Sequence, residues 1–151
     1  MILAALVISG AALCIFNIRG SRESVLEIRD TISGKLYGSW PLDELGEFAI
    51  EFIHSVNQSP VRETFRVKDG RLWLQSVRFY SFGAGIQSDL GEGQQLSRDG
   101  DAMVISGFDI SLKELHLIAG TVSDHVLFVN NEIISLRDYF GRNAQITIRY
   151  K

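Results

Sequence analysis

The sequence predicts an all-β fold, an antiparallel sandwich or small barrel, preceded by one N-terminal hydrophobic helix. Many short segments of alternating hydrophobicity follow one another and are separated by turn residues. No helical segment of about 12 residues separates them, so a parallel sheet with helical crossovers is not expected. A charge-free apolar run extends from Met1 to Phe16. The 151 residues suffice for one domain of ordinary size.

Composition narrows the class of protein. Hydrophobic residues make up 46% of the chain and charged residues 22%, which is typical of a globular domain. The net charge of -3, from 15 basic and 18 acidic residues, gives no electrostatic footprint for nucleic acid, so we expect no nucleic-acid partner. Cys14 is the single cysteine, which excludes an intrachain disulfide.

Residues 1–18 are interpreted as a hydrophobic membrane anchor or signal segment, because they reach the lower length limit of a membrane-spanning helix. A cleaved signal peptide and a lipoprotein signal ending at Cys14 stay open. We favour an uncleaved anchor, because no basic region precedes the run and Leu13 is bulky for a lipoprotein signal. Arg19 and Arg22 follow the run and, taken alone, favour a cytoplasmic domain.

Residues 24–151 form the predicted single antiparallel β domain, which begins with a hairpin around the turn Thr31–Gly34. Residues 48–67 are predicted to form a second hairpin with its loop at Asn57–Pro60. Directly opposed residues of an antiparallel pair share one side of the sheet. In this register His54 faces Glu63, and both lie on the apolar side.

A turn at Lys68–Arg71 leads into a third strand that ends near Ser81. The Asp-Gly pair in this turn suits a type I′ loop. With Lys68 opposite Arg71, Glu63 would face Ser76. We therefore expect His54, Glu63 and Ser76 to line up on one face across three strands.

The second half of the chain is predicted to contain four strand regions, a loop and one helical turn. Its elements are a surface loop over 86–100, a strand over 102–108, two short strands or a helical turn plus a strand over 110–118, a hairpin over 124–136 that turns at Asn130-Asn131, a short helical turn over 136–141, and a closing strand over 144–150.

The pair His54 and Glu63 is the first candidate site. A carboxylate beside an imidazole favours the charged form of both groups, and burial opposes it. Two interpretations stay open: a pair that binds a ligand, a metal or a proton, and a hydrogen-bonded pair that sets strand register. A catalytic triad is disfavoured, because Ser55 points to the opposite face from His54 and Ser76 lies beyond Glu63. No Gly-x-Ser-x-Gly motif is present.

No cofactor is predicted, and no metal site is assigned. His54, Glu63, Asp124 and His125 carry metal-ligating groups, but their spacing matches no compact zinc motif. Asp124 and His125 are adjacent, so only one of them would point inward from a strand. His116 lies among leucines and is expected to be a hydrogen-bonded core or surface histidine.

Three stretches carry a resemblance to a known family. Phe52-Ile-His-Ser-Val-Asn-Gln-Ser-Pro-Val-Arg-Glu63, then Asp69-Gly-Arg-Leu72 and Phe79-x-Ser-Phe-Gly-Ala-Gly85, resemble the bacterial DUF1850 family, a domain of unknown function, and the likeness extends over about residues 24 to 151. The resemblance suggests as site candidates the residues His54, Ser55, Glu63, Gly83 and Gly85. A Gly-rich turn can cradle an anion with its N–H groups, although a bulge or tight bend is the plainer interpretation.

The resemblance also implies a setting. Members of the family are often encoded beside TRAP-type permeases of the TAXI branch, which import small organic acids. We therefore expect a membrane-anchored, non-enzymatic accessory or binding domain at the cell membrane, extracytoplasmic, held through residues 1–18. Its expected partners are a TRAP-type permease or its substrate-binding protein. The alternatives are a hydrolase or metal-dependent enzyme that uses His54 and Glu63, and a structural envelope protein without a ligand.

Overall fold

The computed structural model describes residues 25–82, 89–120 and 122–151, and it confirms an all-β, antiparallel chain. The elements in order are β1 (Val25–Asp30), β2 (Leu36–Pro41), β3 (Glu47–Ile53), β4 (Pro60–Lys68), β5 (Arg71–Phe79), β6 (Gln95–Asp99), β7 (Ala102–Ser106), β8 (Ser111–Leu112), β9 (Leu115–Ala119), β10 (His125–Val129), β11 (Glu132–Ser135), α1 (Leu136–Phe140) and β12 (Ala144–Tyr150).

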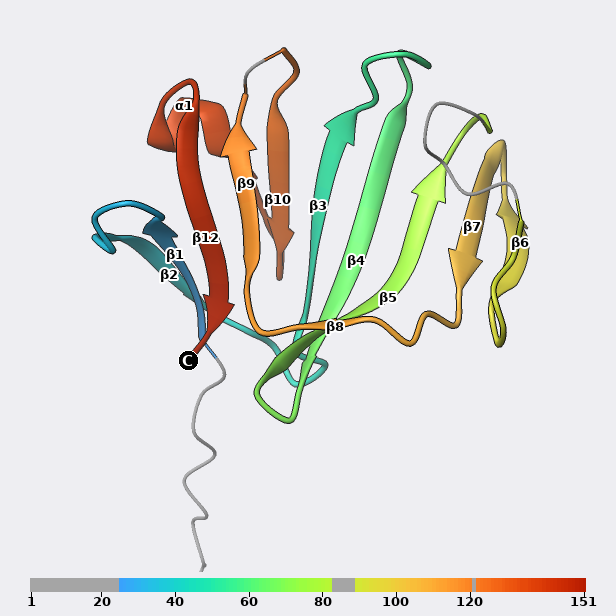
Figure 1. The fold of residues 1–151 in the computed structure, drawn as a ribbon, viewed down its shortest axis with the longest axis horizontal. Helices are drawn as coiled ribbons and strands as arrows, with labels where there is room; N and C mark the ends of the chain where they lie inside the picture. The colour runs from blue at the N-terminus through green and yellow to red at the C-terminus, as the bar shows by residue number, and fades with distance from the viewer. Residues whose placement is uncertain (1–24, 83–88, 121) are drawn as a thin grey trace, which may run out of the picture.

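The strands form two open sheets (Figure 1). The smaller sheet has the order β2-β1-β12-β9, and the larger has the order β11-β10-β3-β4-β5-β7-β6, with β8 paired to β5 off this path. Each sheet has an edge strand at both of its ends, so the described residues form no closed barrel. The predicted N-terminal helix over residues 1–18 lies outside the described residues.

The main hydrophobic core is shared by the two sheets, because strands of both contribute to one cluster. Its largest buried members are Leu26, Ile28, Trp40, Phe48, Ile50, Phe65, Leu72, Leu127, Leu136, Ile146 and Ile148. A second, smaller cluster of Val61, Phe79 and Ile105 lies on β4, β5 and β7. The larger sheet therefore carries two apolar regions on one face, one of them packed against the smaller sheet.

Several predicted turns are confirmed. β1 pairs with β2, and Gly34 in the turn between them has φ +70°. Lys68 lies opposite Arg71, with Asp69 at φ 53° and Gly70 at φ 71°, as a type I′ turn requires. β10 and β11 form the predicted hairpin, α1 is the predicted helical turn, and β12 is the predicted closing strand.

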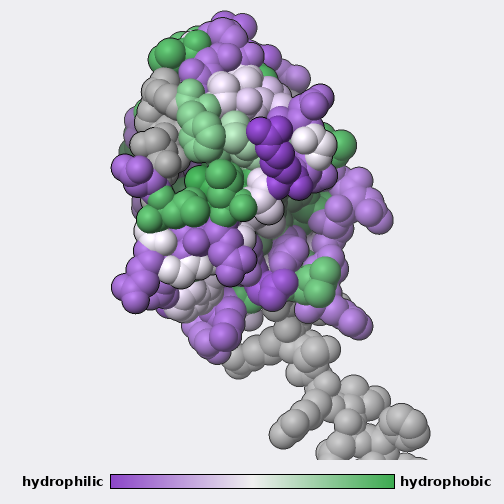
Figure 2. Space-filling model, turned by 90° about the vertical axis from the view of Figure 1, so that its right-hand side faces the viewer, coloured by the Kyte–Doolittle hydropathy of each residue, from purple (hydrophilic) through white to green (hydrophobic). Residues whose placement is uncertain are grey.

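The region before β7 differs from the prediction of a long surface loop. Residues Gln95–Asp99 form an edge strand, β6, whose five residues are all exposed and which, among the described strands, pairs only with β7. Figure 2 looks at this end of the large sheet and shows hydrophobic surface gathered between hydrophilic margins. Leu90 and Leu96, from this part of the chain, are among the exposed large hydrophobic residues. Within the described residues, no helix is long and apolar enough to span a membrane.

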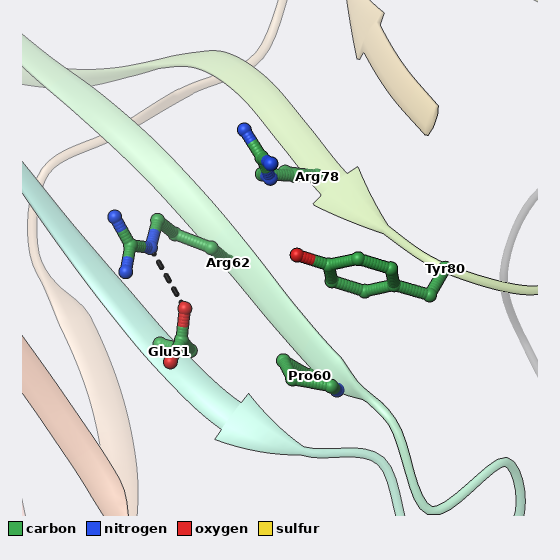
Figure 3. Close-up of a pocket in the computed structure, with 5 residues that line it drawn as sticks. All are labelled: Glu51, Pro60, Arg62, Arg78 and Tyr80. Carbon is green, nitrogen blue, oxygen red and sulfur yellow. Dashed lines mark hydrogen bonds and ion pairs between the residues drawn. The ribbon is translucent and has the colours of Figure 1, made fainter. Parts of the chain in front are cut away.

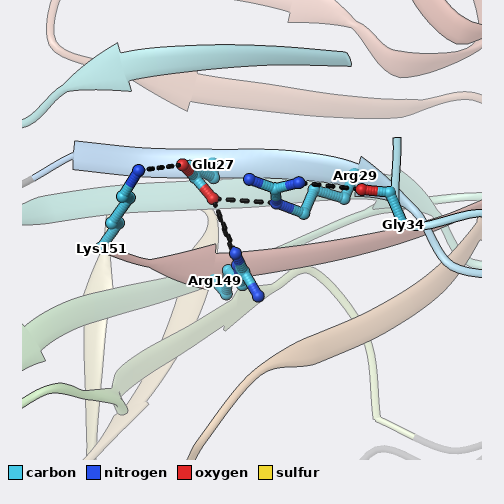
Figure 4. A network of polar contacts seen from close by, with 5 residues as sticks. All are labelled: Glu27, Arg29, Gly34, Arg149 and Lys151. Atoms are coloured by element: carbon cyan, nitrogen blue, oxygen red, sulfur yellow. Dashed lines mark hydrogen bonds and ion pairs between the residues drawn. The ribbon is translucent and has the colours of Figure 1, made fainter. Parts of the chain in front are cut away.

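A buried carboxylate stabilises the end of the smaller sheet. Glu27 is only 3% exposed and accepts hydrogen bonds from Arg29 Nε at 2.9 Å and Arg149 Nη2 at 3.1 Å, with Lys151 Nζ at 3.5 Å (Figure 4). The hydrogen bond from Arg29 is the main cause that holds the pKa of Glu27 below its usual value. Lys151 also pairs through its backbone with Val25, so the C-terminus is fixed beside the start of β1.

Candidate functional site

The loop between β3 and β4 holds His54 in a fixed orientation. The His54 N–H donates to the carbonyl of Ser59 at 2.9 Å, and the Gln58 N–H donates to the carbonyl of His54 at 2.8 Å. His54 Nδ1 accepts hydrogen bonds from the N–H groups of Val56 at 3.3 Å and Asn57 at 3.4 Å. A neutral imidazole that accepts at Nδ1 carries its proton on Nε2, so the loop leaves His54 with one N–H donor on the far side of its ring.

A hollow of about 260 Å³ lies beside this loop and is lined by Phe52, Ile53, His54, Ser55, Val122, Ser123 and His125. It brings together two sequence candidates, His54 and Ser55, with a third, His125, from the neighbouring strand β10. Apolar and polar groups share its lining. The hollow can therefore contact the apolar body of a small molecule and also donate hydrogen bonds to a polar group on it.

His125 enters the hollow from the strand position opposite Phe52, and the two ring centroids are 5.5 Å apart. Its Nδ1 is buried and has no hydrogen-bond partner within the described residues. Burial lowers the pKa of His125, although the nearby Asp124 carboxylate opposes this shift. Burial therefore favours the neutral form of His125.

The predicted contact between His54 and Glu63 is wrong. β3 ends at Ile53, and Glu63 lies opposite Ile50, so the register differs from the predicted one by four residues. An even shift leaves every side chain on its predicted face, and Glu63 does lie on the apolar side of the sheet. Burial raises the pKa of Glu63, and no cation pairs with it within the described residues.

Ser76 also departs from its predicted place. A β-bulge between Thr64 and Phe65 shifts the pairing of β4 with β5, so Ser76 lies opposite Thr64 and Glu63 lies opposite Val77. An extra residue reverses the face of all residues that follow it along the strand. Ser76 is therefore on the other side of the sheet from Glu63, and the predicted row of His54, Glu63 and Ser76 does not form.

The metal-ligating residues named from the sequence do not converge. In the part of the chain that the structure describes, no three His, Cys, Asp or Glu side chains gather around a common point. Asp124 accepts a hydrogen bond from the N–H of Arg137 at 3.1 Å and so anchors α1. His116 is hydrogen-bonded to Thr147 and Glu114 on the surface. Gly83 and Gly85 lie outside the described residues.

A second hollow, of about 280 Å³, lies on the opposite face of the large sheet and was not foreseen. It is lined by Glu51, Pro60, Arg62, Arg78 and Tyr80 (Figure 3). The sequence shows that Arg62 shares a face with Arg66, because Arg62, Thr64 and Arg66 are alternate residues of one strand. Whether Arg78 joins them depends on the bulge. The apolar positions of β5 change phase from Leu72 and Leu74 to Val77 and Phe79, and this change is the sequence signal that could have placed the arginines together.

A family model described as a domain of unknown function (DUF1850) matches residues 48–136. The matched region begins in β3, ends at the first residue of α1 and contains both hollows. No curated protein and no solved structure matches the chain.

Proposed function

The chain belongs to the DUF1850 family of domains of unknown function, and we propose that it is a membrane-anchored, non-enzymatic binding domain that assists the uptake of small organic acids. In this proposal residues 1–18 are the anchor, and the β domain binds its ligand outside the cytoplasm. A TRAP-type permease or its substrate-binding protein is the proposed partner.

One observation carries the binding role: two backbone N–H groups of the β3–β4 loop hold the His54 ring through Nδ1. Because Nδ1 is occupied by two backbone N–H groups, Nε2 is a donor before any ligand arrives. A donor that needs no rearrangement binds an acceptor at low entropic cost. Ser55 lines the same hollow, and in this proposal its hydroxyl supplies a second donor.

The mixed lining suggests how an organic acid would lie in the hollow. Its carboxylate would accept hydrogen bonds from His54 Nε2 and the Ser55 hydroxyl. Its hydrocarbon part would pack against Phe52 and the neutral ring of His125. A short monocarboxylic acid satisfies both requirements, because it combines one carboxylate with an apolar chain.

The enzymatic alternative lacks a supporting contact. A general base of the Ser-His-Asp type needs a carboxylate behind the imidazole. Here the His54 Nδ1 position is taken by backbone N–H groups, Glu63 lies opposite Ile50, and Asp124 caps the N–H of Arg137. In the part of the chain that the structure describes, no contact favours hydrolysis or metal chemistry over binding.

Titration of the full-length protein in detergent with butyrate, followed by NMR of the histidine ring protons, tests the binding site. We expect saturable shifts of the His54 and His125 signals in the wild-type protein. In His54→Ala the remaining His125 signals should no longer shift. His116→Ala is the matched control, because His116 lies on β9 and is bound to Thr147 and Glu114. Equal shifts in wild type and His54→Ala would disprove the proposed site.

A topology reporter fused after Lys151 tests the cellular side of the proposal. A signal outside the cytoplasm supports an accessory role in uptake. A cytoplasmic signal would remove the extracytoplasmic role, whatever the butyrate titration shows.

A further inference from the structure

Two arginines face each other across neighbouring strands on the outer face of the large sheet. Arg62 on β4 is the direct cross-strand partner of Arg78 on β5. Like charges directly opposite each other in a sheet repel and cost stability. An uncharged residue at either position would remove this repulsion. The contribution of the pair to the stability of the fold therefore does not explain why two arginines face each other here.

Each arginine is paired with an acidic residue on its outer side, away from the other. Arg62 Nε donates to Glu51 on β3 at 2.8 Å, and Arg78 forms an ion pair with Asp99 at the end of β6. The charges therefore follow the order minus, plus, plus, minus across this face. The two positive groups are therefore neighbours in the middle of this row, and each has its acidic partner on the far side.

The Arg62 guanidinium is held in place without using all of its donors. Its Cζ lies 3.9 Å from the centre of the Phe128 ring, and its Nε is bound to Glu51. Within the described residues, neither terminal nitrogen of Arg62 donates to an acceptor. A guanidinium oriented by a ring and one carboxylate keeps a free edge for a further oxyanion.

The hollow between these groups is small and strongly polar. Its volume of about 280 Å³ lies near the lower limit of ligand pockets, so it suits a small molecule and not a macromolecule. In Figure 3 the Tyr80 hydroxyl points into the space framed by the other four residues. Tyr80 thus adds a neutral O–H donor to the two guanidinium groups.

We propose that the hollow formed by Arg62, Arg78 and Tyr80 is a binding site for a small oxyanion that carries a carboxylate or phosphate group. The anion lies between the two guanidinium groups, relieves their repulsion and accepts a hydrogen bond from Tyr80. This site is on the opposite face of the sheet from the His54 hollow and does not depend on the function proposed above.

Isothermal titration of the full-length protein in detergent tests this site, with malonate and inorganic phosphate as probes at constant ionic strength set by chloride. We expect saturable binding of at least one probe. Arg62→Gln and Arg78→Gln should each weaken it about tenfold or more, since each removes a charge-assisted hydrogen bond. Preference for malonate would identify a carboxylate ligand, and preference for phosphate a phosphorylated one.

Arg66→Gln is the matched control. Arg66 lies on the same strand and the same face and is also paired with a glutamate, Glu47, but its cross-strand partner is Trp73. The Arg66→Gln variant should therefore bind both probes with the affinity of the wild-type protein. Tyr80 is an exposed residue, and Tyr80→Phe removes one hydroxyl from it, so the variant should fold and bind the probes severalfold more weakly.

Three results would overturn the proposal. The first is no saturable binding of either probe above the chloride background. The second is the same loss of affinity in Arg66→Gln as in Arg62→Gln, and the third is full affinity in both single variants, Tyr80→Phe and Arg78→Gln. If an arginine variant does not fold, Tyr80→Phe and the remaining arginine variant decide. His54→Ala should leave this affinity unchanged, which separates this site from the butyrate site.

Discussion

Replacement of Glu63 by leucine should make the protein more stable at neutral pH. Glu63 lies in a cross-strand row between Ile50 and Val77, and the row continues through Leu127 on one side and Ile105 on the other. Within the described residues, no hydrogen bond or ion pair joins the carboxylate, and burial is the cause that raises its pKa. The charge therefore interrupts an otherwise apolar row between the two hydrophobic clusters.

The size of the effect follows from two contributions. A fully buried leucine side chain stabilises by about 1.5–3 kcal/mol, and a half-buried one by roughly half of that. Removal of a polar group that has no partner relieves about 1 kcal/mol or more. Together these give about 2–3 kcal/mol, which corresponds to a rise in Tm of about 8–12 °C for a domain of this size.

The pH dependence provides a second test. The pKa of Glu63 is raised in the folded state above its usual value of 4.5, so the folded protein holds this proton more tightly than the unfolded chain. The stability that Glu63 contributes is present below pH 4.5 and is lost as the pH rises through the raised folded-state pKa. Glu63→Gln should remove this loss and give a smaller gain in Tm than leucine.

Urea denaturation at pH 5 and pH 8, with circular dichroism as the signal, measures both effects. The reasoning fails if Glu63→Leu is less stable than wild type at pH 8, because the carboxylate would then have a stabilising partner. It also fails if Glu63→Gln keeps the fall in stability between the two pH values.

Three further predictions concern the rest of the fold. Glu27→Gln should cost about 2–3 kcal/mol, since it removes the negative charge that Arg29 and Arg149 share. Because the pKa of Glu27 is lowered in the folded state, the stability that the carboxylate contributes is present above the usual pKa of 4.5 and is lost as the pH falls through the folded-state pKa, so the variant should show less acid destabilisation in urea titrations from pH 7 to 3. Ile148→Ala should cost about 2–5 kcal/mol in urea titrations, and the exposed Ile133→Ala less than about 0.5 kcal/mol; similar values for both would contradict the assigned core. Gly107→Ala should lower Tm more than Gly100→Ala, because both have positive φ but only at Gly107 would a Cβ come within 2.3 Å of a backbone oxygen, that of Gly93; equal Tm values would show that this close approach relaxes freely.

Much of the fold could be predicted because local turn chemistry and hydrophobic alternation fix it. The Asp69-Gly70 turn sets the pairing of β4 with β5 near the loop, and the alternation of β12 marks a strand. β6 was missed because all five of its residues are exposed, so no apolar alternation marks it as a strand. An edge strand of this kind is recognisable only from its partner β7.

The candidate site was harder to predict because hydrophobic alternation constrains only the face of each side chain. A register shifted by four residues keeps the same faces, so the pattern could not distinguish His54 opposite Glu63 from Ile50 opposite Glu63. The bulge beside Phe65 appears in the sequence only as a change of phase in β5, where the apolar positions pass from Leu72 and Leu74 to Val77 and Phe79, and it determines which residues oppose Ser76 and Arg62. The faces of Glu63 and Phe52 were predictable, and their neighbours were not.

The backbone pairing of Val25 with Lys151 has a consequence for engineering this protein. The two ends of the β domain lie side by side, far from the β3–β4 loop (Figure 1). A short peptide joining them would permit circular permutation of residues 25–151, with new termini opened in the turn between β10 and β11. In such a rearranged chain both hollows would keep every strand that lines them, freed from whatever precedes residue 25.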